Sequence, residues 1–287
     1  MPNNEVNRQR NIAVGQSRAS TRAEGRNPSR VLVRSGEERL AHRVLSRPSQ
    51  SRRRCAVVLL GPPGSGKTTA ARCLAARHPV ALIEAGTLLE TEVRMGTALG
   101  QQIRPYKLAG KLVPPDLIKQ VIAHGLEAAA DAQLVVFDGF PRSAQQIEIL
   151  SELLDDHHLK LGAVIQLAVD LQTTLDRLSA RQVCAQCGAV SNRLAKRPRQ
   201  EGVCDLCAGK LTQRPDDRPE IIRNRFEVFQ AETAPVIEFF QREHPDVFSQ
   251  EPGSEASDVL ADRFWRRIEL AMQRDDFCLS ATAKALR

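Results

Sequence analysis

The 287-residue sequence has no hydrophobic run approaching the roughly 18 apolar residues that a membrane-spanning helix needs. Its N-terminus also lacks the apolar segment of a secretory signal. We therefore expect no membrane partner and a cytoplasmic location. Cysteine is present seven times, an odd number in a chain without a secretory signal, which excludes a simple disulfide framework and favours metal ligands or free thiols.

Lysine is absent from the first part of the chain, where arginine replaces it. Residues 1–54 contain 13 Arg and 4 Glu, a balance of +9, whereas the whole chain carries +7. The rest is therefore slightly acidic, and its composition does not indicate a nucleic-acid-binding domain. Residues 1–54 are polar and aperiodic, which predicts a disordered Arg-rich tail. Three roles remain open for the tail: binding a polyanion such as nucleic acid, targeting, or none, as an extension from a misplaced start codon.

The most informative segment is a glycine-rich loop at residues 61–69. It reads Gly61-Pro62-Pro63-Gly64-Ser65-Gly66-Lys67-Thr68-Thr69 and matches the phosphate-binding pattern G-x-x-x-x-G-K-[ST]. An apolar strand is predicted before it at 55–60 and a helix after it at 69–77. Backbone N–H groups and the helix N-terminus would bind phosphates, Lys67 would reach the β- and γ-phosphates, and a hydroxyl of Thr68 or Thr69 would hold Mg²⁺. The segment therefore predicts a site for a magnesium–nucleoside triphosphate.

Further short apolar runs alternate with helical patterns along the chain. Strands are predicted at 80–83, 133–138, 163–169 and 246–249, and helices at 115–131, 145–154, 171–181, 219–243 and 254–274, with mixed helical structure at 84–113. The long helix at 219–243 is expected to bend near Pro235. This order predicts an α/β fold with a doubly wound, five-stranded parallel sheet. The third strand ends at Asp138, where phosphate-loop enzymes place the acid that orients Mg²⁺ through water.

Four cysteines interrupt the alternation between about 182 and 213. They form two C-x-x-C pairs separated by sixteen residues, Cys184, Cys187, Cys204 and Cys207. This spacing is typical of a tetrahedral zinc site, and four thiolates leave no open position, so the metal would be structural. Redox-active pairs or disulfides are the alternative. The insert is too short for a large apolar core, so we expect the ion to fold it. The remaining cysteines, Cys55, Cys73 and Cys278, are expected to be ordinary thiols.

Beyond these patterns, Asp138-Gly-Phe-Pro-Arg142-Ser, followed by Gln146, resembles the signature of the adenylate kinase family. The four-cysteine insert falls where the zinc-containing members carry their lid, and the segments at 214–225 and 233–235 resemble the return from the lid to the core. The resemblance covers residues 55–287. It implies a monomeric nucleoside monophosphate kinase that converts Mg·ATP and AMP into two ADP. Residues 84–113 would close over the monophosphate, and residues 182–213 would form the zinc lid.

The resemblance also implies roles for individual residues. Arg142 would bind the acceptor phosphate, and Arg181, Arg214 and Arg225 would surround the transferred group, as expected for a reaction that depends on charge neutralisation. Arg177 would lie near the ATP base. Asp216 and Asp217 would form a hinge or pair with the closed lid. The acceptor site would further include Gly86, Arg94, Leu112, Val113, Gly139 and Gln146.

The chain departs from the family pattern in two places. Thr68 follows the loop lysine where the family has Gly. In the acceptor segment, the chain has Ala85, Thr87 and Glu90 where the family has Thr, Asp and a phosphate-binding Arg. A carboxylate there would repel a phosphate, so Arg94 is expected to take over the role or to pair with Glu90. Two alternatives follow: a kinase for another monophosphate, or a catalytically weakened ATP-binding or sensor protein.

Overall fold

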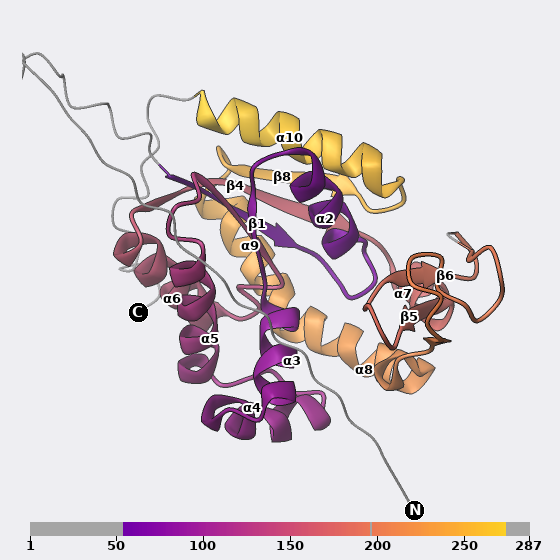
Figure 1. Ribbon diagram of the computed structural model, residues 1–287. Coiled ribbons are helices and arrows are strands. Elements are labelled where there is room, and N and C mark those ends of the chain that lie inside the picture. The colour runs from indigo at the N-terminus through magenta and orange to yellow at the C-terminus, as the bar shows by residue number, and fades with distance from the viewer. Residues whose placement is uncertain (1–53, 196, 274–287) are drawn as a thin grey trace, which may run out of the picture. The chain divides into compact units, whose positions relative to one another are not determined.

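A computed structural model describes residues 54–195 and 197–273 (Figure 1). Its centre is a five-stranded parallel sheet in the order β2-β3-β1-β4-β8, which confirms the predicted fold class. The strands are β1 (Arg54–Leu60), β2 (Ala81–Glu84), β3 (Leu134–Asp138), β4 (Leu159–Ala168) and β8 (Phe248–Pro252). Residues 1–53 of the predicted tail (1–54) and Cys278 lie outside the described residues, whereas Arg54 is not part of a tail but the first residue of β1. Within the described part, no helix is both long and apolar enough to cross a membrane.

Helices cover both faces of the sheet, as a parallel sheet requires. One face packs against α2 (Lys67–Arg77) and α10 (Ser257–Met272). The apolar cluster on the other face contains residues of α3 (Ala85–Met95), α5 (Pro115–Ala128), α6 (Ala144–Asp156) and α9 (Ala234–Glu243). Helix α4 (Ala98–Leu108) joins the same cluster by packing on α3 and α5. Helix α7 (Leu171–Ser179) follows β4.

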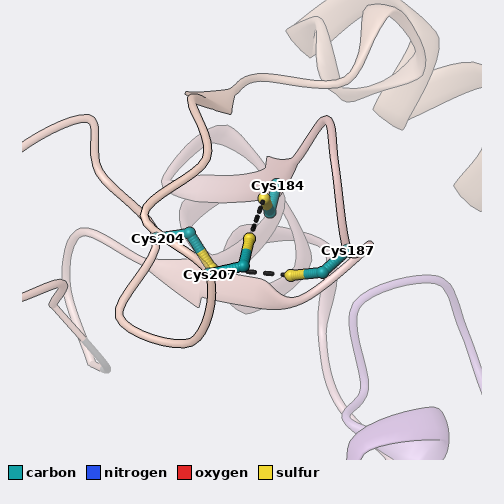
Figure 2. A group of neighbouring side chains, drawn as sticks. All are labelled: Cys184, Cys187, Cys204 and Cys207. Atoms are coloured by element: carbon teal, nitrogen blue, oxygen red, sulfur yellow. Dashed lines mark hydrogen bonds between the residues drawn. The ribbon is translucent and has the colours of Figure 1, made fainter. Parts of the chain in front are cut away.

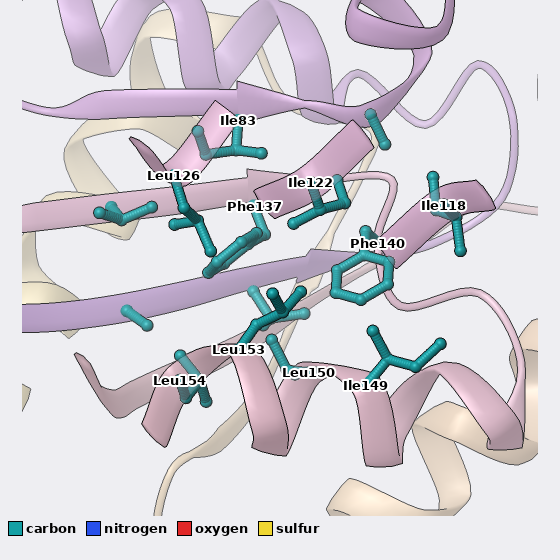
Figure 3. Packing of buried hydrophobic residues seen from close by; sticks show 14 of the residues in the cluster. Ile83, Ile118, Ile122, Leu126, Phe137, Phe140, Ile149, Leu150, Leu153 and Leu154 are labelled. Carbon is teal, nitrogen blue, oxygen red and sulfur yellow. The ribbon is translucent and has the colours of Figure 1, made fainter. Parts of the chain in front are cut away.

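The larger apolar cluster fixes the segment that follows β3. Phe137 and Phe140 are fully buried, with ring centroids 6.2 Å apart. Figure 3 shows both rings between the side chains of α5 and those of α6. Burying an aromatic side chain of this size stabilises the fold by about 2–3 kcal/mol. Phe140 therefore anchors the loop that carries Gly139 and Arg142 at the edge of the sheet.

The predicted long helix at 219–243 is not continuous. It consists of α8 (Pro219–Val228), a π-helical segment η2 (Phe229–Thr233) and α9. Pro235 has no N–H group, and its ring would clash with the carbonyl four residues earlier. The wider π-turn just before it accommodates the proline. The last strand was also misplaced, because β8 begins at Phe248 and extends to Pro252.

The cysteine insert forms a separate small antiparallel sheet. Its strands are β5 (Arg181–Cys184), β6 (Val190–Asn192) and β7 (Leu211–Thr212), in the order β6-β5-β7. A short 3₁₀ helix, η1 (Pro215–Asp217), leads from β7 towards α8. The described apolar cluster of the insert is small and contains Cys184, Cys204 and Leu211. Little besides the cysteines therefore holds this part together.

Arg54 fastens the start of β1 to the ends of three other segments. Its guanidinium donates hydrogen bonds of 2.8 Å to the backbone carbonyls of Ala132, His157 and Ala129. We predict that Arg54→Met lowers the free energy of unfolding by about 2–4 kcal/mol, because charged donors make the stronger hydrogen bonds. Urea denaturation would measure the change. Arg77→Met is the control: it removes only an exposed ion pair with Asp262, which is worth at most about 1 kcal/mol. Equal effects of the two variants would contradict the assignment.

Candidate active site

The phosphate-binding loop joins β1 to α2 and encloses Lys67. The Lys67 ammonium donates to the carbonyls of Gly61 (2.6 Å) and Pro62 (2.9 Å) and to the hydroxyl of Ser65 (2.9 Å). Helix α2 begins directly after Gly66, which has φ +96° and no capping side chain. The first N–H groups of α2 therefore have no side-chain acceptor, which suits an incoming anion.

Two side chains of α2, one helical turn apart, contact the carboxyl ends of neighbouring strands. The Thr68 hydroxyl donates to Asp138 at the end of β3. Arg72 donates two hydrogen bonds of 2.6 Å to Glu84 at the end of β2. Glu84 and Asp138 are direct neighbours in the β2–β3 pair. Of the two threonines proposed for Mg²⁺, it is thus Thr68 that lies beside the acid.

The loop after β3 presents Arg142 to the same edge of the sheet. The Arg142 side chain donates to the carbonyl of Gly139 at 2.7 Å, while its backbone N–H donates to the side chain of Gln146 at 2.8 Å. Thr233 of η2 donates to the carbonyl of Arg142, also at 2.8 Å. Gln146 is buried. In this structure, Gln146 and Thr233 therefore support the loop that carries the arginine.

Three further arginines are held by two aspartates of η1. Arg181 makes a bidentate pair with Asp217, with distances of 2.7 and 2.6 Å, and Asp217 is fully buried. Arg225 lies 3.2 Å from Asp216 and 3.7 Å from Asp217, and Arg214 lies 3.2 Å from Asp216. The two aspartates thus gather arginines from both sides of the insert.

The charges of Lys67, Arg142, Arg181 and Arg225 are linked to one another, so these four side chains lie near each other. Burial is the main cause that lowers the pKa of Lys67 to about 8; Asp138 opposes the shift, and the positive charges of Arg142 and Arg225 contribute to it. The pKa of Arg225 is lowered mainly by burial, with repulsion from Arg181 and Arg142 also contributing. A cluster of cations that repel one another is poised for a polyanion such as a triphosphate.

The depressed pKa of Lys67 has a measurable consequence. At pH 8 about half of the lysine is unprotonated in the free protein, and the phosphates of a bound triphosphate raise its pKa again. We therefore predict that binding of Mg·ATP takes up about half a proton at pH 8 and almost none at pH 6.5. Calorimetry in two buffers with different ionisation enthalpies measures this uptake. A binding enthalpy independent of the buffer at pH 8 would contradict the prediction, and Lys67→Arg is the control that cannot titrate.

The acceptor segment differs from what was expected. Glu90 of α3 does not pair with Arg94 but with Lys107 of α4, at 2.5 Å. The tight packing of α3 on α4 brings a tertiary partner to Glu90, and Arg94 is exposed. A side chain at Gly86 would have nothing within 4 Å, so this position faces open space. Val113 is buried in the main core and Leu112 is half-buried.

Arg177 of α7, which was expected to lie near the ATP base, contacts the phosphate loop in this structure. Its guanidinium donates to the carbonyls of Gly64 and Ser65, both at 3.4 Å. Another residue of α7, Thr174, donates to the carbonyl of Pro63 at 3.2 Å. Helix α7 therefore packs directly against the loop.

The four cysteines of the insert lie together and fit a metal ion (Figure 2). Their sulfur atoms all lie within 4.8 Å of one another, with Cys184–Cys207 at 3.4 Å and Cys187–Cys204 at 3.6 Å. Four thiolates around zinc would be about 3.8 Å apart, from a Zn–S bond of about 2.3 Å. A hydrogen bond from the backbone N–H of Cys187 is the largest of the effects that lower the pKa of Cys184 to about 6, whereas the neighbouring thiols raise the pKa of Cys207.

Sequence reasoning missed several partners in this site. The Arg72–Glu84 pair and the role of Thr233 had no local signal, because each joins elements far apart in the chain. The pairing of Arg181 with Asp217 was not predicted, because Asp217 was expected to form a hinge or to pair with the closed lid. A cation-rich site should contain structural carboxylates, which could have suggested these pairs.

This combination of phosphate loop, strand-end aspartate and converging arginines defines a phosphate-loop phosphotransferase. The family model for adenylate kinase matches residues 59–244. Curated relatives named adenylate kinase include one from Kosmotoga olearia, 36% identical over 74% of this chain and 98% of the relative, and one from Pyrococcus abyssi, 34% identical over 74% and 93%. A third, from Zymomonas mobilis, is 38% identical over 64% of this chain and 83% of its own. The chain belongs to the adenylate kinase family.

Proposed function

We propose that the protein transfers the γ-phosphoryl group of Mg·ATP to AMP, giving two ADP. The observation that carries the proposal is the set of cations linked to the phosphate loop: the charges of Arg142 and Arg225 act on Lys67, and the charge of Arg181 acts on Arg225. Phosphoryl transfer needs positioning and charge neutralisation more than covalent chemistry. The relatives named adenylate kinase support the same reaction.

On the donor side, the loop N–H groups and Lys67 would bind the β- and γ-phosphates of ATP, and Arg177 would stack on the base. Asp138 and Thr68 would hold Mg²⁺ with its waters, and the ion would supply further neutralisation of the phosphate charge. The contact between Thr68 and Asp138 fits this role, because it brings a hydroxyl and a carboxylate together next to the loop.

On the acceptor side, Arg142 would hold the phosphate of AMP so that its oxygen attacks the γ-phosphorus while ADP leaves. Arg181, Arg214 and Arg225 would neutralise the charge that develops on the transferred group. Because Asp216 and Asp217 engage these arginines in the present structure, the arginines would exchange carboxylate for phosphate partners when the substrates bind. The insert at 182–213 would act as a zinc-bound lid that excludes water from the transfer.

A panel of nucleoside monophosphates tests the proposal. With Mg·ATP as donor, we expect AMP to be phosphorylated at least tenfold more efficiently than GMP, CMP or UMP, measured as kcat/KM in a coupled assay. Preference for another monophosphate would reassign the acceptor. The changes at Ala85, Thr87 and Glu90 raise this alternative, which the relatives named adenylate kinase do not favour. Tight ATP binding without transfer to any acceptor would indicate a sensor protein instead.

A further inference from the structure

A cavity that borders the phosphate loop lies on the α9 side of the sheet. It is a groove of about 620 Å³ at the carboxyl ends of β4 and β8. Side chains alternate along a strand, and Ile165 and Leu167 pack with α2 and α10 on the opposite face. Gln166 and Ala168 therefore face α9, and both line the groove. None of the residues proposed above for phosphate or metal binding lines this groove.

The floor of the groove carries an amide pair on rigid strands. Gln166 of β4 and Gln250 of β8 are register partners in the parallel ladder, so their side chains lie next to each other. Gln166 and Lys160 are the two polar residues of β4, and Gln166 lies near its carboxyl end. Polar side chains at such a position usually have a hydrogen-bonding role.

Helix α9 forms the opposite wall of the groove and also contributes an amide side chain to it. Ala234, Ile237, Glu238 and Gln241 of α9 all line the groove at the spacing of one helical face. Gln230 of the π-helical segment adds a fourth amide. Amides from two sides of one groove offer paired donors and acceptors, which match the edge of a nucleobase.

The charges in the groove exclude phosphate. Its charged lining residues are Asp170 and Glu238, and none of the described residues that line it is Lys, Arg or His. Carboxylates accept hydrogen bonds from hydroxyl groups, as acidic residues do from ribose in dinucleotide sites. Apolar surface from Pro62, Val169 and Phe229 would cover a flat ring.

We propose that this groove binds a nucleoside, a base with its ribose but without phosphate. The amides would recognise the base, and the two carboxylates would accept the ribose hydroxyls. The volume falls within the range of roughly 300–1,000 Å³ that is usual for small-molecule sites. The proposal does not depend on the phosphotransfer assigned above.

The groove adjoins the phosphate site at two points. Pro62 lines it, and the carbonyl of the same residue accepts a hydrogen bond from Lys67 at 2.9 Å. The π-helical segment also lines it, and Thr233 of that segment holds the carbonyl of Arg142. π-Helical turns occur frequently at functional sites. A nucleoside bound here would contact the phosphate loop at Pro62 and the π-helical segment η2, the two segments that hold Lys67 and Arg142.

Calorimetry with adenosine, guanosine and cytidine tests the proposal on the full chain. We expect one equivalent of at least one nucleoside to bind, both in the free protein and when a non-hydrolysable ATP analogue and AMP saturate the nucleotide sites. Failure of all three to bind at millimolar concentration would overturn the proposal. Complete displacement by the nucleotides would also overturn it, because the nucleoside would then occupy the phosphate site. Binding of spermidine but of no nucleoside would also overturn the proposal and would indicate that the acidic groove binds a cationic amine.

Two variants locate the site. Gln250→Leu removes one amide of the floor, and Glu238→Lys reverses one charge; each should weaken nucleoside binding at least tenfold. Both side chains are exposed, so the fold should tolerate the changes. Gln120→Leu on α5 is the matched control, since it removes an exposed amide elsewhere. Wild-type binding in both groove variants would contradict the assignment.

Discussion

Replacing Lys67 with Met should lower kcat at least a thousandfold and leave the melting temperature within about 2 °C or raise it. The loss of activity follows from the position of the ammonium, which three groups of the loop hold where the phosphates are expected. Side chains that neutralise the transferred phosphoryl group are worth several powers of ten in phosphotransfer.

Although Lys67→Met should lose activity, it should not lose stability, because burial lowers the pKa of Lys67 from 10.5 to about 8. A lowered lysine pKa means that the folded protein disfavours the proton. The buried charge therefore lowers the free energy of unfolding by its full amount below pH 8, and this loss disappears as the pH rises towards 10.5. Removing the charge relieves this cost at neutral pH.

Steady-state kinetics and thermal unfolding on the same preparation would measure both effects. Lys119→Met is the control, because Lys119 forms an exposed ion pair with Glu152 elsewhere in the fold. A Lys67→Met variant that keeps a tenth of the activity would refute the proposed role. A lower melting temperature with lost activity would point to a structural role instead.

Replacing Cys187 with Ser should reduce bound zinc from about one equivalent to almost none and unfold the insert locally. The physical reason is the small apolar cluster of this region, which consists largely of the cysteines themselves. In such small units the free energy of metal binding is the free energy of folding. The parallel sheet has its own large core and should remain folded.

Metal analysis and amide hydrogen exchange would separate these effects. In the Cys187→Ser variant, we expect fast exchange in residues 181–213 and unchanged protection in β1, β3 and β4. Cys73→Ser is the control, because Cys73 lies in α2 outside the cluster and should leave the metal content unchanged. Stoichiometric zinc in the Cys187→Ser variant would show that the four thiolates are not the ligands.

The features that could be predicted from the sequence are those encoded within short segments. The phosphate loop and the two C-x-x-C pairs combine side chains a few residues apart, so their spacing alone specified them. The partner of Glu90 illustrates the limit. The local rule favoured Arg94 one turn away, but the packing of α3 on α4 supplied Lys107. The same holds for the aspartates of η1, whose arginine partners come from both sides of the insert.

Helix α2 contacts both substrate halves of the proposed site. On the donor side, Thr68 donates a hydrogen bond to Asp138 at the end of β3. One turn later, Arg72 binds Glu84, the residue directly before α3. Because α2 is a single helix, a movement of α2 would shift both contacts together. If a bound triphosphate shifts α2, it would therefore also move the start of α3 on the acceptor side. Binding of one nucleotide would then change the affinity for the other, independently of any closure of the insert.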